Sequence, residues 1–353
     1  MLNFALVGCG RIAKRHSELL GFEQIKGARL IAVCDLIEEK SKKIGEQFSI
    51  AYYTDMHQMM RNEKIDVVVV LTESGNHAKD VIELSQYRKH IVVEKPMALK
   101  LDDADAMIRA CDNAGAKLFV IKQNRFNLPV LKLREALEQG RFGKLVLGTV
   151  RVRWCRHQSY YDQASWLGTW EMGGGVLANQ ASHHIDLLGL IMGDVESVFA
   201  LSTTALAKIE AEDTAVAILK FRNGALGVIE ATTATRPKDL EGSISILGEG
   251  GTVEIGGFAV NNIKVWNFVE TKPSDKNVIE KYSVNPPNVY GFGHQAYYEY
   301  VVNCISNNSP HFVNGLVGKK SLELINAIYE SIKTSREVFL CLKKKNCSLG
   351  GAY

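Results

Sequence analysis

The chain opens with Asn3-Phe4-Ala5-Leu6-Val7-Gly8-Cys9-Gly10-Arg11-Ile12-Ala13, an apolar run that leads directly into a glycine turn and a helical pattern. Gly8 permits the tight turn, and Gly10 lets a pyrophosphate approach the backbone, where the first amides of the helix can bind the anion. Ala13 replaces the third glycine of such motifs, which is a tolerated change. The segment predicts a dinucleotide site whose contacts include Gly8, Gly10, Arg11 and Ile12.

A carboxylate follows the next apolar run. Asp35 ends the run 29–34 and stands 27 residues after Gly8. Its side chain can accept hydrogen bonds from both ribose hydroxyls, and its charge would repel a 2′-phosphate. We therefore expect NAD rather than NADP as the cofactor. Asp35 could also cap a helix from Leu36 onward, and both roles can hold at once.

Short apolar runs alternate with helical patterns over the first 122 residues. The runs cover residues 3–7, 29–34, 67–71, 91–93 and 118–121. This alternation predicts a parallel, doubly wound sheet with helices on both faces and a nucleotide site at its carboxyl edge. Two of the runs end at this edge in Thr72 and Glu94, which we expect to contact the cofactor.

Lys95 stands between Glu94 and Pro96, beside the expected nicotinamide site. Pro96 disfavours helical geometry at Lys95. A lysine at the end of a strand is usually a solvated surface charge, but its place between a carboxylate and a proline favours a catalytic role here. As an ammonium, Lys95 would hydrogen-bond the substrate oxygen and favour the developing alkoxide.

The pattern changes after residue 123 to longer alternating runs, which predict a mostly antiparallel sheet with one face able to meet another surface. The runs cover residues 145–153, 195–203, 214–221, 225–233, 243–247 and 262–268, and helical stretches follow at 293–306 and 319–339. We expect an α/β protein with a cofactor domain over 1–122, a substrate and oligomerisation domain over 123–340, and a solvated tail over 341–353.

A second candidate for proton transfer lies in a helical pattern over residues 175–188. At about 100° per residue, Asn179, His183 and Asp186 fall within roughly 60° of one another, so His183 shares a polar face. His184 points toward apolar positions and is expected to be structural. If the bound dinucleotide accepts a hydride from an alcohol, a base must face the hydroxyl, and His183 on this polar face is the residue that we assign to it. Lys95 and His183 should then converge on one alcohol, although their two roles can be exchanged.

The strand predicted over 145–153 places Arg151 and Arg153 on one face, and an aromatic loop follows. Guanidinium groups pair with carboxylate or phosphate, and ring faces pack against a sugar or base. This predicts an anion site with aromatic walls. The alternative to an anion site is that this segment forms a solvated basic strand followed by a surface loop. The loop contributes Arg156, Tyr160, Tyr161 and Trp166.

Composition excludes several classes of protein. The net charge of +3 gives no field suited to nucleic acid as the main partner. No apolar stretch approaches the roughly 20 residues of a membrane span, and no secretory signal opens the chain, so a cytoplasmic location is expected. The seven cysteines are scattered and form no Cys-x-x-Cys pair, which predicts reduced thiols and no metal site.

The chain resembles the glucose-fructose oxidoreductase, inositol dehydrogenase and MocA family of NAD(P)-dependent sugar and polyol dehydrogenases. The resemblance rests on the glycine turn, Glu94-Lys95-Pro96, Gln123-Asn124-Arg125-Phe126, and the segment from Gly173 to Asp186. It implies a Rossmann domain, an α/β domain whose open sheet makes oligomer contacts in a dimer or tetramer, and a catalytic lysine and histidine. The family usually has Asp where this chain has Asn179. The implied cofactor contacts add Lys95 and Gln123, and the implied substrate contacts are Lys95, Asn124, Arg125, Arg153, Tyr161, Trp166, Asn179 and His183.

The same segments are similar to one subgroup, the UDP-N-acetyl-2-amino-2-deoxyglucuronate dehydrogenases. These oxidise carbon 3 of a nucleotide-linked sugar acid for bacterial surface polysaccharide, and some recycle the reduced cofactor with 2-oxoglutarate. Such a substrate carries a carboxylate and a diphosphate, which suits several arginines. An inositol or free-hexose dehydrogenase is the alternative within the family, and a non-catalytic NAD-binding regulator is the alternative of another class.

Overall fold

The computed structural model describes residues 1–283, 292–340 and 349–350. The tail predicted over 341–353, with Cys341 and Cys347, lies almost wholly outside these residues. The chain divides into two compact units. Unit 1 comprises Met1–Lys122 and His294–Leu322, and unit 2 comprises Gln123–Gly293 and Glu323–Tyr353.

Unit 1 contains a six-stranded parallel sheet in the order β3-β2-β1-β4-β5-β6. The strand order reverses between β1 and β4, which is the point where open α/β sheets bind ligands. The doubly wound sheet predicted from the sequence is therefore confirmed. Its strands are β1 (Leu2–Val7), β2 (Ala28–Cys34), β3 (Ala51–Tyr53), β4 (Val67–Val70), β5 (His90–Val93) and β6 (Leu118–Val120).

Helices connect these strands, and the central strands are buried on both sides. All four valines of β4 are inaccessible to solvent, as expected for a strand covered on both faces. The helices are α1 (Ala13–Gly21), α2 (Glu38–Phe48), α3 (Met56–Asn62), α4 (His77–Ser85) and α5 (Leu101–Ala114).

One segment departs from the domain limits expected from the sequence. Residues 294–322 were assigned to the second domain, but they pack in unit 1. Tyr298 of α11 (Gly293–Ser306) is fully buried, and its ring meets the edge of Phe4 at 5.8 Å between centroids. Asn314 forms a β-bridge with Phe119 of β6. The helical pattern of α11 was visible in the sequence, but not the surface that its apolar side covers.

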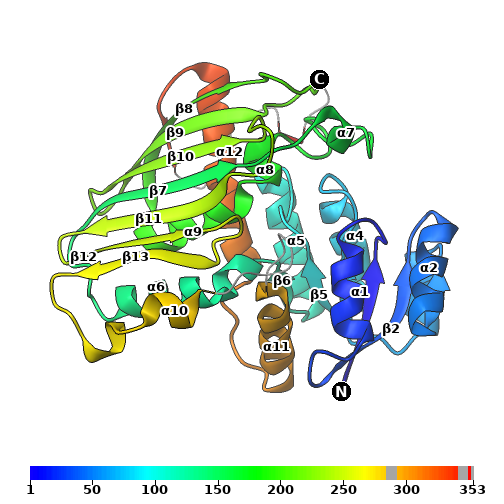
Figure 1. Cartoon of the computed structure of the whole chain (residues 1–353). Helices are drawn as coiled ribbons and strands as arrows, with labels where there is room; N and C mark the ends of the chain where they lie inside the picture. Colours follow the sequence, from blue (N-terminus) through cyan, green and yellow to red (C-terminus); the bar gives the residue numbers. More distant parts are fainter. Residues whose placement is uncertain (284–291, 341–348, 351–353) are drawn as a thin grey trace. The chain divides into compact units, whose positions relative to one another are not determined.

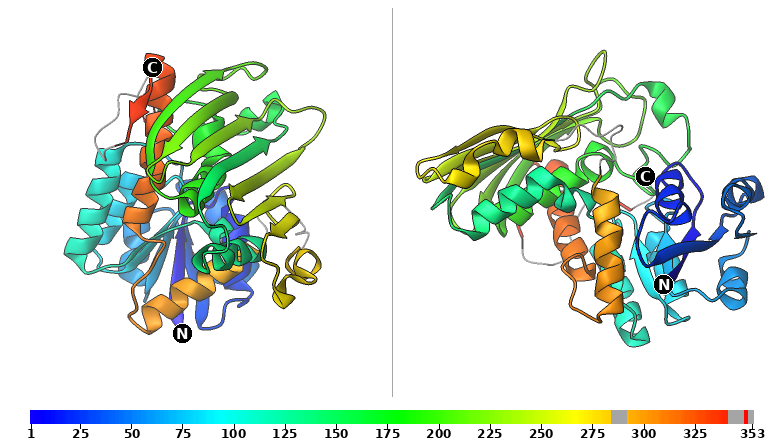
Figure 2. Two further views of the ribbon diagram at one scale, coloured as in Figure 1. Left: turned by 90° about the vertical axis from the view of Figure 1, so that its left-hand side faces the viewer. Right: turned by 60° about the horizontal axis from the view of Figure 1, so that its bottom comes forward.

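Unit 2 contains an eight-stranded sheet in the order β13-β12-β11-β7-β10-β9-β8-β14, which both views of Figure 2 show as one twisted layer. All its pairs are antiparallel except β7 with β10, so the predicted sheet is confirmed. The strands are β7 (Leu145–Arg153), β8 (Val195–Thr203), β9 (Thr214–Phe221), β10 (Leu226–Thr232), β11 (Glu241–Gly248), β12 (Gly251–Gly256), β13 (Asn262–Phe268) and β14 (Val338–Phe339).

One face of this sheet is covered and the other is open. Burial alternates strictly along β9, where Ala217 and Leu219 are buried while Val216 and Ile218 are exposed. Helix α9 (Ser182–Met192) packs against β7 and β11 on the covered face.

The remaining helices are η1 (Gln123–Phe126), α6 (Leu128–Glu138), α7 (Gln158–Tyr161), α8 (Val176–Asn179), η2 (Pro273–Asp275) and α10 (Val278–Tyr282), with α12 (Gly315–Thr334) running from unit 1 into unit 2.

The single helix expected over 175–188 is wrong, because α8 and α9 are separate. The amide of Ala181 donates to the carbonyl of Val176, five residues back, and this wide turn interrupts the helical ladder. The ladder resumes when the amide of Ile185 donates to Ala181. Asn179 therefore ends α8, and the helical spacing that grouped it with His183 does not apply.

Two further observations concern membrane spans and cysteines. Across the described ranges, no helix combines the length and apolar character that a bilayer span requires. The cysteines within those ranges, Cys9, Cys34, Cys111, Cys155 and Cys304, are free thiols.

Gly8 is a position where only glycine fits. Its φ is +96°, and a Cβ would lie 2.7 Å from the carbonyl carbon of Leu71. We expect Gly8→Ala to destabilise the protein by about 2 kcal/mol or more, because it adds both backbone strain and a clash. Thermal unfolding measures the change. Gly10→Ala is the matched control, since a Cβ on Gly10 meets nothing within 4 Å. Equal melting temperatures for the two variants would contradict this account.

Candidate functional site

The glycine turn and Asp35 are joined directly in unit 1. Asp35 Oδ2 accepts from the amide of Cys9 at 2.7 Å, and Oδ1 accepts from the amide of Ile37 at 2.9 Å. Helix α2 starts only at Glu38, so Asp35 forms a local turn rather than its cap. No side chain caps the start of α1, and its first turn has no acidic residue. The backbone amides at the start of α1 therefore remain suited to an anion, and a Cβ at Gly10 would meet nothing within 4 Å. Together these features fit a pyrophosphate group.

A buried histidine that the sequence analysis did not identify joins the ends of β4 and β5. His77 begins α4 and is 1% exposed. Its Nδ1 lies 2.8 Å from the carbonyl oxygen of Pro96, and its Nε2 lies 3.0 Å from that of Thr72. Thr72 in turn donates its hydroxyl to Asp80 at 2.6 Å. Thr72 and the Lys95-Pro96 turn, both expected at the cofactor edge, are thus linked through one imidazole.

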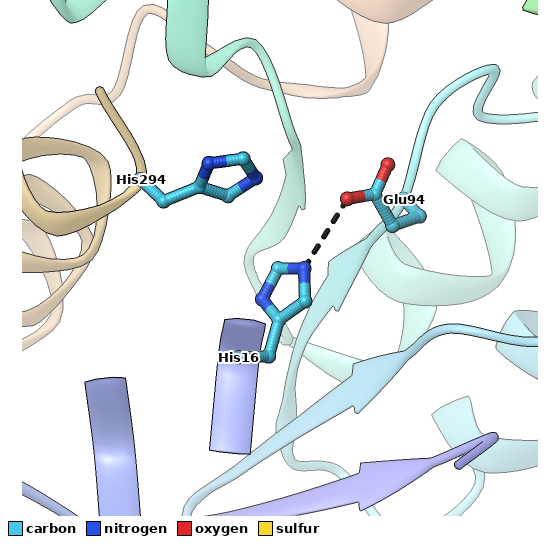
Figure 3. Close-up of side chains that lie close together, drawn as sticks. All are labelled: His16, Glu94 and His294. Atoms are coloured by element: carbon cyan, nitrogen blue, oxygen red, sulfur yellow. Dashed lines mark hydrogen bonds and ion pairs between the residues drawn. The ribbon is translucent and has the colours of Figure 1, made fainter. Parts of the chain in front are cut away.

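Glu94 lies in a buried cluster with two histidines (Figure 3). Its Oε1 is 3.2 Å from Nε2 of His16, and its Oε2 accepts from the amide of Lys95 at 2.8 Å. The opposite nitrogen of His16, Nδ1, is 2.7 Å from the hydroxyl of Tyr298. Burial would raise the pKa of Glu94, but the hydrogen bond and charge of His16 hold that pKa well below its ordinary value. Glu94 is therefore an ionised carboxylate.

The same cluster has the spacing of a metal site. His16, Glu94 and His294 each present a ligand atom, and these atoms lie within 4.8 Å of one another. No metal was expected from the sequence. The contacts of His16 with Glu94 and with Tyr298 engage both of its ring nitrogens, so hydrogen bonding accounts for this histidine without an ion.

Lys95 follows Glu94 and is half-buried. Burial lowers the pKa of its amine, and the negative charge of Glu94 opposes that change. A lowered pKa brings the neutral amine closer to physiological pH, so Lys95 is suited to exchange a proton as well as to stabilise an anion.

In unit 2, His183 lies in the first turn of α9 and is 9% exposed. A hydrogen bond of 2.9 Å joins its Nε2 to the side-chain amide of Gln123 in η1. Gln123, which was also expected to contact the cofactor, donates to this imidazole. His184, the next residue, is fully buried against Trp154, and burial lowers its pKa to about 4, so it is neutral.

A buried ion pair ties η1 to α9 a second time. Arg125 donates from Nε and Nη2 to the two carboxylate oxygens of Asp186 at 2.7 and 2.8 Å. Both side chains are buried. Through this pair Arg125, which was expected to bind substrate, anchors the helix that carries His183. Asn124, between the two linked residues, is buried as well.

The anion site expected around Arg153 is not supported by its surroundings. Its guanidinium binds Glu230 at 2.5 and 2.7 Å and Glu241 at 2.9 Å, so two carboxylates already compensate its charge. Arg156 is likewise paired with Asp239 at 2.9 Å. The sequence showed the alternation that aligns Arg153, but not the carboxylates on the neighbouring strands β10 and β11.

The aromatic residues of the following loop are partly packed into unit 2. Tyr161 is buried, and its hydroxyl lies 2.8 Å from Oγ1 of Thr233. Trp166 remains half-buried beside Gly173, where a Cβ would approach its ring to 3.1 Å. Asn179 is also half-buried at the end of α8. Trp166 and Asn179 thus keep more exposure than Tyr161.

A buried carboxyl that the sequence analysis missed supports the entry to α8. Glu212 Oε1 accepts from the amide of Leu177 at 3.0 Å and from the hydroxyl of Tyr329 at 2.9 Å. The carbonyl and carboxyl oxygens of Glu212 lie so close to Gly175 that no Cβ fits there. Burial raises the pKa of Glu212 to about 7, although these hydrogen bonds oppose the change. An acidic residue outside any motif gives no local signal of this role.

Two family models match nearly the whole chain. One, described as an oxidoreductase family with an NAD-binding Rossmann fold, matches residues 2–122. The other, described as the C-terminal alpha/beta domain of the same family, matches residues 134–340. A curated relative, myo-inositol 2-dehydrogenase of Thermotoga maritima, is 33% identical over 65% of this chain and 68% of its own length.

Solved structures show a similarity that covers both units. The WlbA dehydrogenase from Bordetella pertussis, in complex with NADH and UDP-GlcNAcA, is 42% identical with a TM-score of 0.89, covering 97% of this chain and 99% of that one. The WlbA dehydrogenase from Chromobacterium violaceum, with the same two ligands, is 42% identical with a TM-score of 0.90, covering 97% and 96%.

The raised pKa of Glu212 predicts a pH-dependent stability. Between about pH 4.5 and 7 the folded protein holds a proton at Glu212 that the unfolded chain releases, so stability falls as the pH rises through this window. The full effect is on the order of 3 kcal/mol. We expect Glu212→Gln, which cannot ionise, to flatten the change in melting temperature between pH 5 and 8. Exposed Glu171→Gln is the control, and identical profiles for both variants and the parent would refute the assignment.

Proposed function

Because the chain belongs to the Gfo/Idh/MocA family of oxidoreductases and is an NAD-dependent sugar or polyol dehydrogenase, we propose that it oxidises carbon 3 of UDP-N-acetyl-2-amino-2-deoxyglucuronate. The observation that carries this choice is the 42% identity, over almost the full length of both chains, to dehydrogenases solved with NADH and UDP-GlcNAcA. By the same resemblance the reaction would serve bacterial surface polysaccharide.

The cofactor edge of unit 1 fits NAD. Asp35 offers a carboxylate beside the glycine turn, where it can bind ribose hydroxyls and disfavour a 2′-phosphate. The uncapped start of α1 suits the pyrophosphate. When bound, NAD supplies the acceptor for a hydride. The remaining contacts proposed for the cofactor are Gly8, Gly10, Arg11, Ile12, Thr72, Glu94, Lys95 and Gln123.

Two residues are proposed to handle the proton of the alcohol. His183 would accept it, since the residue lies in the first turn of a helix anchored by Arg125 and Asp186. The Gln123 amide, which donates to Nε2 of the imidazole, would give up this contact when Nε2 takes the proton. Lys95 would hydrogen-bond the same oxygen and stabilise the alkoxide, and its lowered pKa also allows the two roles to be exchanged. Asn124, Trp166 and Asn179 are proposed as substrate contacts.

Arg125, Tyr161 and Arg153, which were expected to contact the substrate, have other partners in the structure. Arg125 acts by anchoring α9, and Tyr161 packs against Thr233, so neither is assigned a direct contact. Glu230 and Glu241 compensate the positive charge of Arg153. We therefore do not assign Arg153 to the diphosphate or the carboxylate of the substrate. A homo-oligomer, formed through the open face of the large sheet, and cofactor recycling with 2-oxoglutarate remain part of the proposal.

The alternative within the family is a free-polyol dehydrogenase, which the 33% identity to myo-inositol 2-dehydrogenase favours. A panel of UDP-sugars and free polyols with NAD, read by the absorbance of the reduced cofactor, separates the two. We expect turnover with UDP-GlcNAcA and at least a hundredfold lower kcat/KM with myo-inositol. Preferred turnover of myo-inositol would replace the proposed substrate.

Lys95→Ala and His183→Ala should each lower kcat at least about a hundredfold, the scale of one acid-base group, while NAD binding is retained. Binding is measured by titration of the dinucleotide, and kcat at saturating UDP-GlcNAcA. Lys100→Ala is the control, because Lys100 is an exposed lysine in the same segment. Near-parental turnover in either alanine variant would remove that residue from the mechanism.

A further inference from the structure

The turn that carries Lys95 is bound by side chains on both sides. On one side the amide of Lys95 donates to Glu94, whose other oxygen contacts His16. On the other side the carbonyl of Pro96 contacts Nδ1 of His77. Two imidazoles from α1 and α4 therefore enclose one short turn at the end of β5.

We propose that His16 and His77 are positioning residues that hold the Glu94-Lys95-Pro96 turn and thereby direct the side chain of Lys95. This inference rests on the proposed catalytic role of Lys95, because a held turn matters to the reaction only if Lys95 takes part in it. Neither histidine is assigned a contact with the substrate.

Burial makes both contacts costly to lose. His16 is 0% exposed and His77 is 1% exposed. A buried acceptor left without its donor destabilises the folded protein, and the effect is larger when the acceptor is charged. Glu94 is such a charged acceptor, so loss of its His16 contact would favour rearrangement of the carboxylate and, with it, of the Lys95 amide that it binds.

The His16 side is itself anchored to a distant part of unit 1. Tyr298, fully buried on α11, lies 2.7 Å from Nδ1 of His16. The other ring nitrogen of His16, Nε2, is directed toward Glu94, as Figure 3 shows. Tyr298, His16 and Glu94 thus form a chain of hydrogen bonds that ends on the backbone of Lys95.

The His77 side links two strand ends rather than one. Carbonyl oxygens only accept, so contacts to both Pro96 and Thr72 favour the doubly protonated imidazole. Burial opposes this and lowers the pKa of His77, while the charges of Glu94 and Asp80 favour the proton. The contact to Pro96 is the shorter of the two, and it is the one that restrains the lysine turn.

Paired substitutions can remove one ring contact at a time. Asparagine places an amide near the position of Nδ1, and glutamine places one near Nε2. His77→Asn therefore keeps the contact to Pro96 and loses that to Thr72, and His77→Gln does the reverse. At His16 the contact to the turn is made by Nε2 and not by Nδ1. His16→Gln therefore keeps the contact to Glu94, and His16→Asn loses it.

We expect His77→Gln and His16→Asn to lower kcat with UDP-GlcNAcA tenfold or more, while KM and the Kd for NAD change less than about threefold. A displaced catalytic group lowers the rate of the chemical step more than it weakens the binding of substrate or cofactor. His77→Asn and His16→Gln should stay within about threefold of the parent in all three constants. The apparent pKa of Lys95, read from the pH dependence of its reductive methylation by mass spectrometry, should shift only in the first pair.

Equal effects of asparagine and glutamine at each site would overturn the proposal, as would losses confined to NAD affinity. Stabilisation of the parent, but not of His16→Gln, by added Zn²⁺ in thermal unfolding would overturn it as well, since the cluster with Glu94 and His294 would then be a metal site. Lys95→Ala separates the two hypotheses. If that variant keeps its turnover, the proposed function of Lys95 fails even where the methylation shift shows that the histidines hold the turn.

Discussion

The carboxyl ends of parallel strands leave backbone groups that the sheet ladder does not pair, and unit 1 depends on how these groups are bound. At this edge Asp35 accepts the amides of Cys9 and Ile37, and Glu94 accepts the amide of Lys95. His77 faces the carbonyls of Thr72 and Pro96. The polar side chains suited to a dinucleotide therefore also hold the backbone that would receive it.

In unit 2 a buried carboxyl also binds backbone that the regular ladders leave unpaired, and burial favours its neutral form. Glu212 binds the amide of Leu177 and the hydroxyl of Tyr329, and it packs so closely on Gly175 that a larger residue is excluded there. Burying an ionised carboxylate at this place would cost more than burying the protonated acid. The result is a fixed entry into α8, just ahead of the helix that carries His183.

Local pattern was a good guide where one face of an element is buried and the other is open. The alternation over 145–153, 214–221 and 262–268 corresponds to β7, β9 and β13, because a period of two residues belongs to a half-buried strand. It was a poor guide to the helix over 175–188, where the break after Asn179 depends on a single wide turn at Val176. Apolar composition continues through that break, so periodicity could not reveal it.

By itself the sequence determined the two sheets, the glycine turn with Asp35, and the family, because these are written in short-range spacing and in motifs of adjacent residues. Only the tertiary structure decided which partner each charged side chain takes. Arg153 meets Glu230 across 77 residues of chain, and Arg125 meets Asp186 across 61. It also decided that α11 covers the first sheet. Such contacts depend on which surfaces pack together, and no local pattern carries that information.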